Sequence, residues 1–141
     1  MPGDGHCFIS SILKSLSSQW PNTFSFSKDE LLSKIERETL DNMNDYAAFL
    51  NDENTKSHLV RSMYQYILDK KYDTSYGDLI PLITANAVGI DIGIVIKTSD
   101  QFDYRHIVSK GSTDDCVFIV KNGMHYDSLI LTSEFTNQNG H

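Results

Sequence analysis

The stretch that decides the fold is Gly3-Asp4-Gly5-His6-Cys7-Phe8, which leads from a turn into the first predicted helix. The two glycines allow backbone conformations closed to other residues, so the amides from Asp4 to Cys7 could converge on a developing oxyanion. A cysteine at this point is a candidate nucleophile, because the positive end of a helix favours thiolate over thiol. A lone cysteine at a helix start is more often a small buried residue, and it is the neighbouring glycines that favour a nucleophile here.

A second motif, Met124-His125-Tyr126-Asp127, stands near the end of the chain on a predicted strand. Residues two apart on a strand share a face, so His125 and Asp127 project together while Tyr126 points the other way. The carboxylate can then hold the imidazole in the tautomer that presents its other nitrogen to a thiol. With Cys7 these side chains are the groups of a cysteine hydrolase. For this segment alone, a plain surface hairpin remains the alternative.

The first half of the sequence predicts helices. Apolar residues recur at helical spacing from Phe8 to Ser17, so Cys7 falls in or near a first turn. Ser27-Lys28-Asp29-Glu30 matches a capping box and predicts the start of a second helix. The pattern also predicts a short helical turn from Asp45 to Leu50 and a long helix through Leu59 to Leu68.

A fourth helix is expected to begin at Asp78 as its cap and to stop at Gly89. Pro81 would then lie in the first turn, where a missing N–H leaves no bond unmade. After Gly89 the pattern changes to β-branched runs that predict four strands: Ile90 to Ile96, Tyr104 to Val108, Val117 to Val120 and Met124 to Leu131. Asn122-Gly123 is expected to be the two-residue turn of an antiparallel hairpin between the last two.

The composition indicates one domain over residues 1–135, with a polar, disordered tail at 136–141. The net charge is −7, and the 12 Lys and Arg residues are scattered, so nucleic acid is not expected as a partner. No apolar run is long enough to span a bilayer, and no membrane partner is expected. Two cysteines in a chain of 141 residues indicate a reducing compartment, the cytoplasm or the nucleus. Cys116 is interpreted as structural.

Zinc binding by His6, Cys7, His125 and Asp127 was considered as an alternative use of these side chains. It is disfavoured, because structural zinc sites draw ligands in closely spaced pairs and the adjacent His6 and Cys7 cannot readily ligate one ion. No metal or organic cofactor is expected.

Together the two motifs resemble the ovarian-tumour (OTU) domain family of papain-like cysteine proteases, most of which are deubiquitinases. The family pattern Asp-Gly-x-Cys before a helix corresponds to Asp4-Gly5-His6-Cys7, and its closing His, aromatic, Asp or Asn corresponds to His125-Tyr126-Asp127. Between them, Tyr76-Gly77-Asp78 and Gly89-Ile90-Asp91-Ile92 resemble the middle of the domain. The resemblance covers nearly the whole chain.

The resemblance implies an α+β fold, with helices packed against a small, mainly antiparallel sheet. It implies Cys7 as the nucleophile, His125 as the general base and acid, Asp127 as the residue that orients His125, and Asp4 as the carboxylate of the oxyanion region. The implied activity is cysteine isopeptidase cleavage of ubiquitin, polyubiquitin or a ubiquitin-like modifier from conjugates, by a monomer. The alternative is a catalytically silent ubiquitin-binding module.

Two departures from the family pattern affect what is expected. Many members carry Asn or Ser where His6 stands, and this second imidazole could either favour the Cys7 thiolate or hydrogen-bond outward. Relatives often have a strand or helix before the cysteine loop, so a segment that helps to bind ubiquitin could be missing from this sequence. Linkage preference is not predicted.

Overall fold

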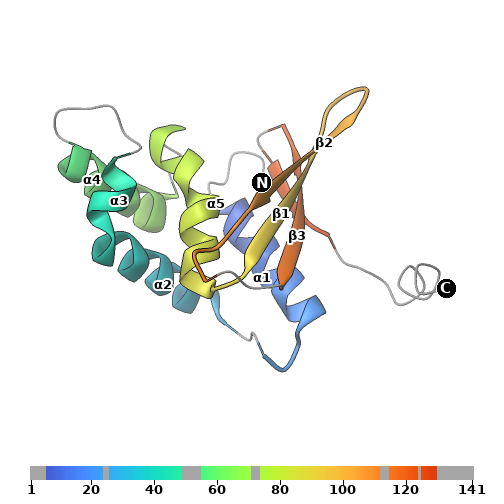
Figure 1. Ribbon diagram of the computed structural model, residues 1–141, viewed down its shortest axis with the longest axis horizontal. Helices are drawn as coiled ribbons and strands as arrows, with labels where there is room; N and C mark the ends of the chain where they lie inside the picture. The colour runs from blue at the N-terminus through green and yellow to red at the C-terminus, as the bar shows by residue number, and fades with distance from the viewer. Residues whose placement is uncertain are drawn as a thin grey trace.

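The computed structural model describes residues 6–23, 26–48, 55–70, 74–111, 115–123 and 125–129. Its helices all precede its strands, as the sequence predicts (Figure 1). The helices are α1 (Cys7–Gln19), α2 (Lys28–Asp41), α3 (Met43–Ala47), α4 (Thr55–Asp69) and α5 (Thr74–Val88). The strands are β1 (Asp91–Lys97), β2 (Phe102–Ile107), β3 (Cys116–Asn122) and β4 (His125–Ser128). The expected α+β class is confirmed.

The four strands form one mixed sheet in the order β2-β1-β3-β4. β1 pairs antiparallel with β2 and parallel with β3, and β3 pairs antiparallel with β4. The sheet is therefore mainly antiparallel, as expected. The hairpin of β1 and β2 projects away from the helices (Figure 1). None of the helices in the described ranges is long and apolar enough to cross a membrane.

The predicted capping box at the start of α2 is confirmed. The Ser27 hydroxyl accepts a hydrogen bond from the Glu30 amide at 3.1 Å, and the Glu30 carboxylate accepts one from the Ser27 amide at 3.0 Å. Two amides that the helix itself cannot pair are thereby satisfied. These bonds also lower the pKa of Glu30, with the Ser27 amide as the largest cause.

The fourth predicted helix begins earlier than expected. α5 starts at Thr74, so Asp78 is not its cap and Pro81 lies inside the helix instead of in its first turn. Pro81 cannot donate to the carbonyl of Gly77, which costs one helical hydrogen bond. Burial of Tyr76 in the added turn offsets this loss, because its ring is buried and its hydroxyl bonds Thr39 at 3.2 Å. The predicted end at Gly89 is confirmed, where φ is +84°.

The predicted β3–β4 hairpin is present, but its turn lies one residue later than expected. Asn122 pairs with His125, so Asn122 belongs to the strand ladder and not to the two-residue turn expected from the sequence. Gly123 has φ +64°, a conformation that glycine adopts without strain. Each residue of β4 thereby shifts by two positions relative to β3. The shift is even, so every side chain stays on the face that the sequence predicts.

The core lies between the helices and one face of the sheet. α1 packs against β3 and β4, and α2 packs against α5. The side chains of this core that are almost fully buried include Ile9, Ile12, Leu16, Leu31, Ile35, Leu59, Met63, Ile83, Ile92 and Ile119. The packing of α1 on β4 joins the two ends of the chain that carry the candidate catalytic residues. The predicted domain limits at 135 and 136 lie outside the described residues.

Candidate active site

Cys7 is the first residue of α1 and is half-buried against the core. The helix begins there because the amphipathic stripe starts at Phe8, and Ser11 donates its hydroxyl to the Cys7 carbonyl at 2.8 Å. The first turn of α1 carries no acidic side chain. No carboxylate of that turn therefore competes with a thiolate for the positive end of the helix. This position is the one predicted for a nucleophile.

His6 points into the core and fixes the start of α1. Its side chain is 2% exposed, and its Nε2 lies 2.6 Å from the carbonyl oxygen of Tyr66 in α4. Because a carbonyl can only accept, Nε2 carries the proton and donates it. The His6 and Tyr66 rings also pack at a centroid distance of 5.0 Å. His6 therefore anchors the residue before Cys7 to α4, which neither alternative drawn from the sequence anticipated.

His125 and Asp127 meet as the sequence predicts. Nε2 of His125 lies 3.7 Å from Oδ2 of Asp127, which is ion-pair distance and longer than a hydrogen bond. Both side chains are accessible, with 50% of His125 and 73% of Asp127 exposed. Catalytic hydrogen bonds are often this long in apo structures and shorten only in the substrate complex.

The helix that carries Cys7 and the strand that carries His125 lie side by side. The rings of Phe8 and Tyr126 pack edge to face at 5.1 Å, and the Leu129 amide donates to the Ser15 hydroxyl at 3.3 Å. α1 and β4 therefore run in the same direction. Cys7 and His125 each precede a residue of the Phe8–Tyr126 contact, so they lie at the same end of this pair.

Tyr126 faces α1, so alternation along β4 turns His125 and Asp127 toward the opposite face of the sheet. β4 is an edge strand of the described sheet. An imidazole on this strand can therefore approach the start of α1 only around that edge. Asp4, Gly3 and Gly5 lie outside the described residues, so the carboxylate and the oxyanion loop expected there stay predictions.

A metal centre finds no support in the described part of the chain. No three His, Cys, Asp or Glu side chains within those ranges are arranged to hold an ion. His6, one of the ligands considered for zinc, already uses Nε2 to bond the Tyr66 carbonyl.

A second polar cluster, on the opposite face of the sheet from α1, was not anticipated from the sequence. His106 of β2 donates from Nε2 to Asp91 Oδ2 at 2.8 Å, which leaves its Nδ1 to accept from the Tyr104 hydroxyl at 2.9 Å. A Cβ on Gly93 would come within 2.6 Å of the Tyr104 oxygen and the Phe118 ring, so glycine makes room for this cluster. Strand propensity alone does not predict this cluster, because its side chains meet only through the pairing of β1 with β2.

Cys116 interacts with Tyr104 and Asp91 of this cluster, and neither its thiol nor the Tyr104 phenol is suited to attack a carbonyl. Burial is the largest cause that raises the pKa of the Cys116 thiol, and the charge of Asp91 raises it further. Burial is likewise the largest cause that raises the pKa of the Tyr104 hydroxyl, and the nearby Cys116 adds to it. Both groups therefore stay protonated at neutral pH, which supports the structural interpretation of Cys116.

Because of this cluster, we expect the free energy of unfolding to fall at acid pH. The Ser109 amide and then His106 lower the pKa of Asp91 below its unfolded value, which is about 3.9. The resulting stabilisation is present above that value and is lost as the pH falls through the lower folded pKa. In urea unfolding followed from pH 6 down to pH 3, we expect the advantage of the wild type over Asp91→Asn to shrink with acid. A constant difference across this range would contradict the prediction.

Solved structures of OTU deubiquitinases share this fold. An OTU deubiquitinase from Wolbachia pipientis wMel is 14% identical, with a TM-score of 0.63 over 97% of this chain and 91% of its own. The structure of an OTU deubiquitinase from the same organism bound to ubiquitin is 17% identical, with a TM-score of 0.60 over 91% of each chain. No protein-family profile and no curated protein matches the sequence.

The fold of this chain is therefore that of OTU deubiquitinases, and the resemblance drawn from the two motifs is confirmed at that level. At 14% to 17% identity the likeness concerns the backbone arrangement. The assignment of Cys7, His125 and Asp127 rests on their positions in α1 and β4, and on the residues that bring these two elements together.

Proposed function

We propose that this protein is a cysteine isopeptidase that removes ubiquitin or a ubiquitin-like modifier from conjugates. The observation that carries the proposal is the packing of α1 on β4 through Phe8 and Tyr126, the immediate neighbours of Cys7 and His125. Asp127 supplies the third member of the proposed Cys-His-Asp triad, since its Oδ2 lies 3.7 Å from Nε2 of His125. Ubiquitin is the first modifier to test, because one structure with this fold was solved bound to it.

In the proposed mechanism the Cys7 thiolate attacks the carbonyl carbon of the modifier's C-terminal glycine, and His125 holds the proton taken from the thiol. Collapse of the tetrahedral intermediate breaks the carbon–nitrogen bond, and His125 returns this proton to the leaving lysine amine. A water molecule then attacks the thioester while His125 accepts its proton, which releases the modifier and regenerates the thiol. Asp127 orients the imidazole, and the backbone amides of the loop from Asp4 to Cys7 stabilise the oxyanion.

The direct test is reaction of the purified protein with ubiquitin that carries a thiol-reactive warhead at its C-terminus. We expect a single adduct by mass, absent in Cys7→Ala and retained in the matched control Cys116→Ala. An adduct that persists in Cys7→Ala would place the nucleophile elsewhere. A folded wild type that gives no adduct with ubiquitin would count against ubiquitin as the modifier, and the same warhead on a ubiquitin-like protein would then be tried.

The competing function is a ubiquitin-binding module without turnover, and the His125–Asp127 distance beyond hydrogen-bond range is the observation that favours it. Thiol reactivity separates the two functions. If Cys7 is activated, a small alkylating reagent at neutral pH will modify Cys7 faster than Cys116, whose pKa is raised mainly by burial. Peptide mass mapping over time measures both rates. Equal rates in the native protein would favour the binding module.

Replacement of Asp127 by Asn is expected to lower turnover only in part. The amide oxygen can still accept from the imidazole, and it loses only the charge that stabilises the imidazolium. We expect kcat to fall by about ten- to a hundredfold, less than removal of the base itself would cost. Steady-state kinetics on a fluorogenic ubiquitin amide would measure the change. Complete insensitivity would mean that another carboxylate, such as Asp4, orients His125.

A further inference from the structure

A small pocket opens on the sheet face that carries Tyr126, beside the candidate active site. Its volume is about 60 Å³, and its apolar walls come from Pro81 of α5 and from Ile94 and Ile96 of β1. Arg105 of β2 and Lys121 of β3 supply its charged groups, and the Tyr126 ring closes one side. We call this the Arg105–Lys121 pocket.

The strand register explains why the two cations converge. Ile94 pairs with Arg105, and Lys121 pairs with both Ile96 and Tyr126, so all five side chains project from one face. Nζ of Lys121 lies 5.6 Å from the centre of the Tyr126 ring, a cation–π distance. The pocket therefore depends on three strand pairings and not on any local sequence motif.

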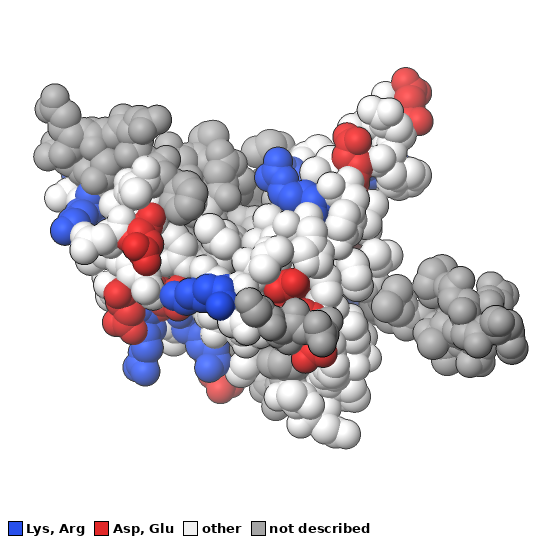
Figure 2. All heavy atoms as spheres, viewed as in Figure 1, with Lys and Arg blue, Asp and Glu red and all other residues white. Residues whose placement is uncertain are grey.

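Neither cation has a carboxylate partner among the described residues, although the chain carries 19 acidic side chains against 12 basic ones. Lys110, by contrast, pairs with Glu38 at 2.7 Å. Figure 2 shows acidic side chains at the tip of the β1–β2 hairpin and basic side chains nearer its base. Two cations without a carboxylate partner in the described ranges, set at one apolar-walled pocket, favour an anionic ligand.

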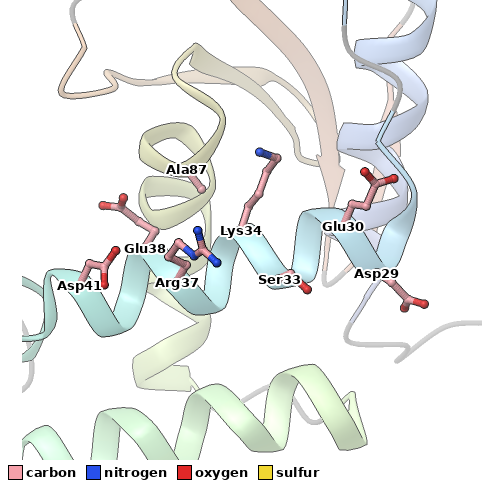
Figure 3. Close-up of a pocket in the computed structure, with 8 residues that line it drawn as sticks. All are labelled: Asp29, Glu30, Ser33, Lys34, Arg37, Glu38, Asp41 and Ala87. Atoms are coloured by element: carbon pink, nitrogen blue, oxygen red, sulfur yellow. The ribbon is translucent and has the colours of Figure 1, made fainter.

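A second pocket on the molecule does not carry an excess of cations. It runs along α2 with a volume of about 540 Å³ and is lined by Lys34 and Arg37 together with four acidic residues (Figure 3). Its side chains spread along the helix in several directions, and its four carboxylates outnumber its two cations. With this excess of carboxylates, the pocket along α2 does not favour an anionic ligand.

The position of the pocket connects it to the proposed reaction. Tyr126 stands between His125 and Asp127 in the sequence, and its ring contacts both the pocket and Phe8, the residue after Cys7. A group held in the pocket would therefore lie one aromatic ring away from the start of α1.

We propose that the Arg105–Lys121 pocket binds a carboxylate side chain of the protein substrate during cleavage. This inference rests on the proposed isopeptidase function. The pocket is small, at about 60 Å³, and its two cations suit a single carboxylate group. The carboxylate comes either from the modifier or from the protein to which the modifier is attached.

The test compares Arg105→Glu and Lys121→Glu with Lys97→Glu. Lys97 carries the same charge on the same sheet but, by alternation from Ile96, projects from the opposite face. Each variant is assayed on ubiquitin with a small fluorescent C-terminal amide and on di-ubiquitin. We expect each pocket variant to raise KM about tenfold with little change in kcat, as for loss of a charge-assisted contact, while Lys97→Glu stays near wild type.

The two substrates identify the source of the carboxylate. A KM effect on both places it on the modifier, and an effect on di-ubiquitin alone places it on the acceptor protein. Pocket variants that match Lys97→Glu on both substrates, in an active and folded enzyme, would overturn the inference while leaving the proposed function intact.

A wild type that cleaves neither substrate would refute the proposed function for ubiquitin. A binding measurement tests carboxylate binding by the Arg105–Lys121 pocket in that case too. N-acetylglutamate, titrated at millimolar concentration, should shift the methyl resonances of Ile94 and Ile96. Its neutral analogue N-acetylglutamine should not, and the shifts should vanish in Arg105→Glu and persist in Lys97→Glu. Equal responses to the two amino acids would overturn the inference.

Discussion

Replacement of His125 by alanine is expected to lower kcat/KM on a fluorogenic ubiquitin amide by about a thousandfold or more, since positioned general bases contribute about 10²- to 10⁴-fold. The closing motif and the α1–β4 contact place His125 at the Cys7 end of the described structure, whereas the neighbouring His6 is buried and uses Nε2 to bond the Tyr66 carbonyl. Removal of the base leaves the thiol without a proton acceptor and the leaving amine without a donor. The loss should therefore appear in kcat, with KM little changed.

The stability of the His125→Ala variant should stay close to that of the wild type. Half of the His125 side chain is exposed, and exposed positions outside special features contribute within about 0.5 kcal/mol. His106→Ala is the matched control, because that half-exposed imidazole lies on β2 and bonds Asp91. It should retain activity. Equal losses in both variants would mean that sheet integrity limits the rate, and an active His125→Ala would refute the proposed mechanism.

The placement of Cys7 at a helix start and of His125 and Asp127 on one strand was predictable because the signals are local. A cysteine after a glycine turn, followed by an apolar stripe, specifies a helix N-terminus within a few residues. His125 and Asp127 share a face by strand alternation alone, and the even register shift of the β3–β4 turn left that face unchanged. The sequence could not say that Phe8 would meet Tyr126, because that contact joins opposite ends of the chain.

The features that were missed depend on tertiary contacts. α5 begins at Thr74 because burial of Tyr76 outweighs the hydrogen bond lost at Pro81, and helix propensity cannot weigh that exchange. His6 bonds a carbonyl 60 residues away. The Arg105–Lys121 pocket requires the parallel pairing of β1 with β3, which hydrophobic periodicity does not reveal.

Replacement of Ile9 by alanine is expected to destabilise the fold by about 2–5 kcal/mol, the usual cost of emptying a fully buried aliphatic site. Ile9 is 0% exposed and belongs to α1, two residues after Cys7. Typical domains have only about 5–15 kcal/mol of stability, so the variant should lose a large part of it. Denaturant unfolding measures the change as a lower midpoint at unchanged slope.

Leu68→Ala is the matched control, because it removes an aliphatic side chain of the same size from a position that is 73% exposed. Its effect should stay within about 0.5 kcal/mol. α1 carries Cys7 and packs on β4, so a loosened Ile9 site should also weaken warhead labelling at temperatures where the protein is still folded. An Ile9→Ala variant as stable as Leu68→Ala would mean that α1 does not join the two halves of the site. The packing argument for a shared Cys7 and His125 site would then fail.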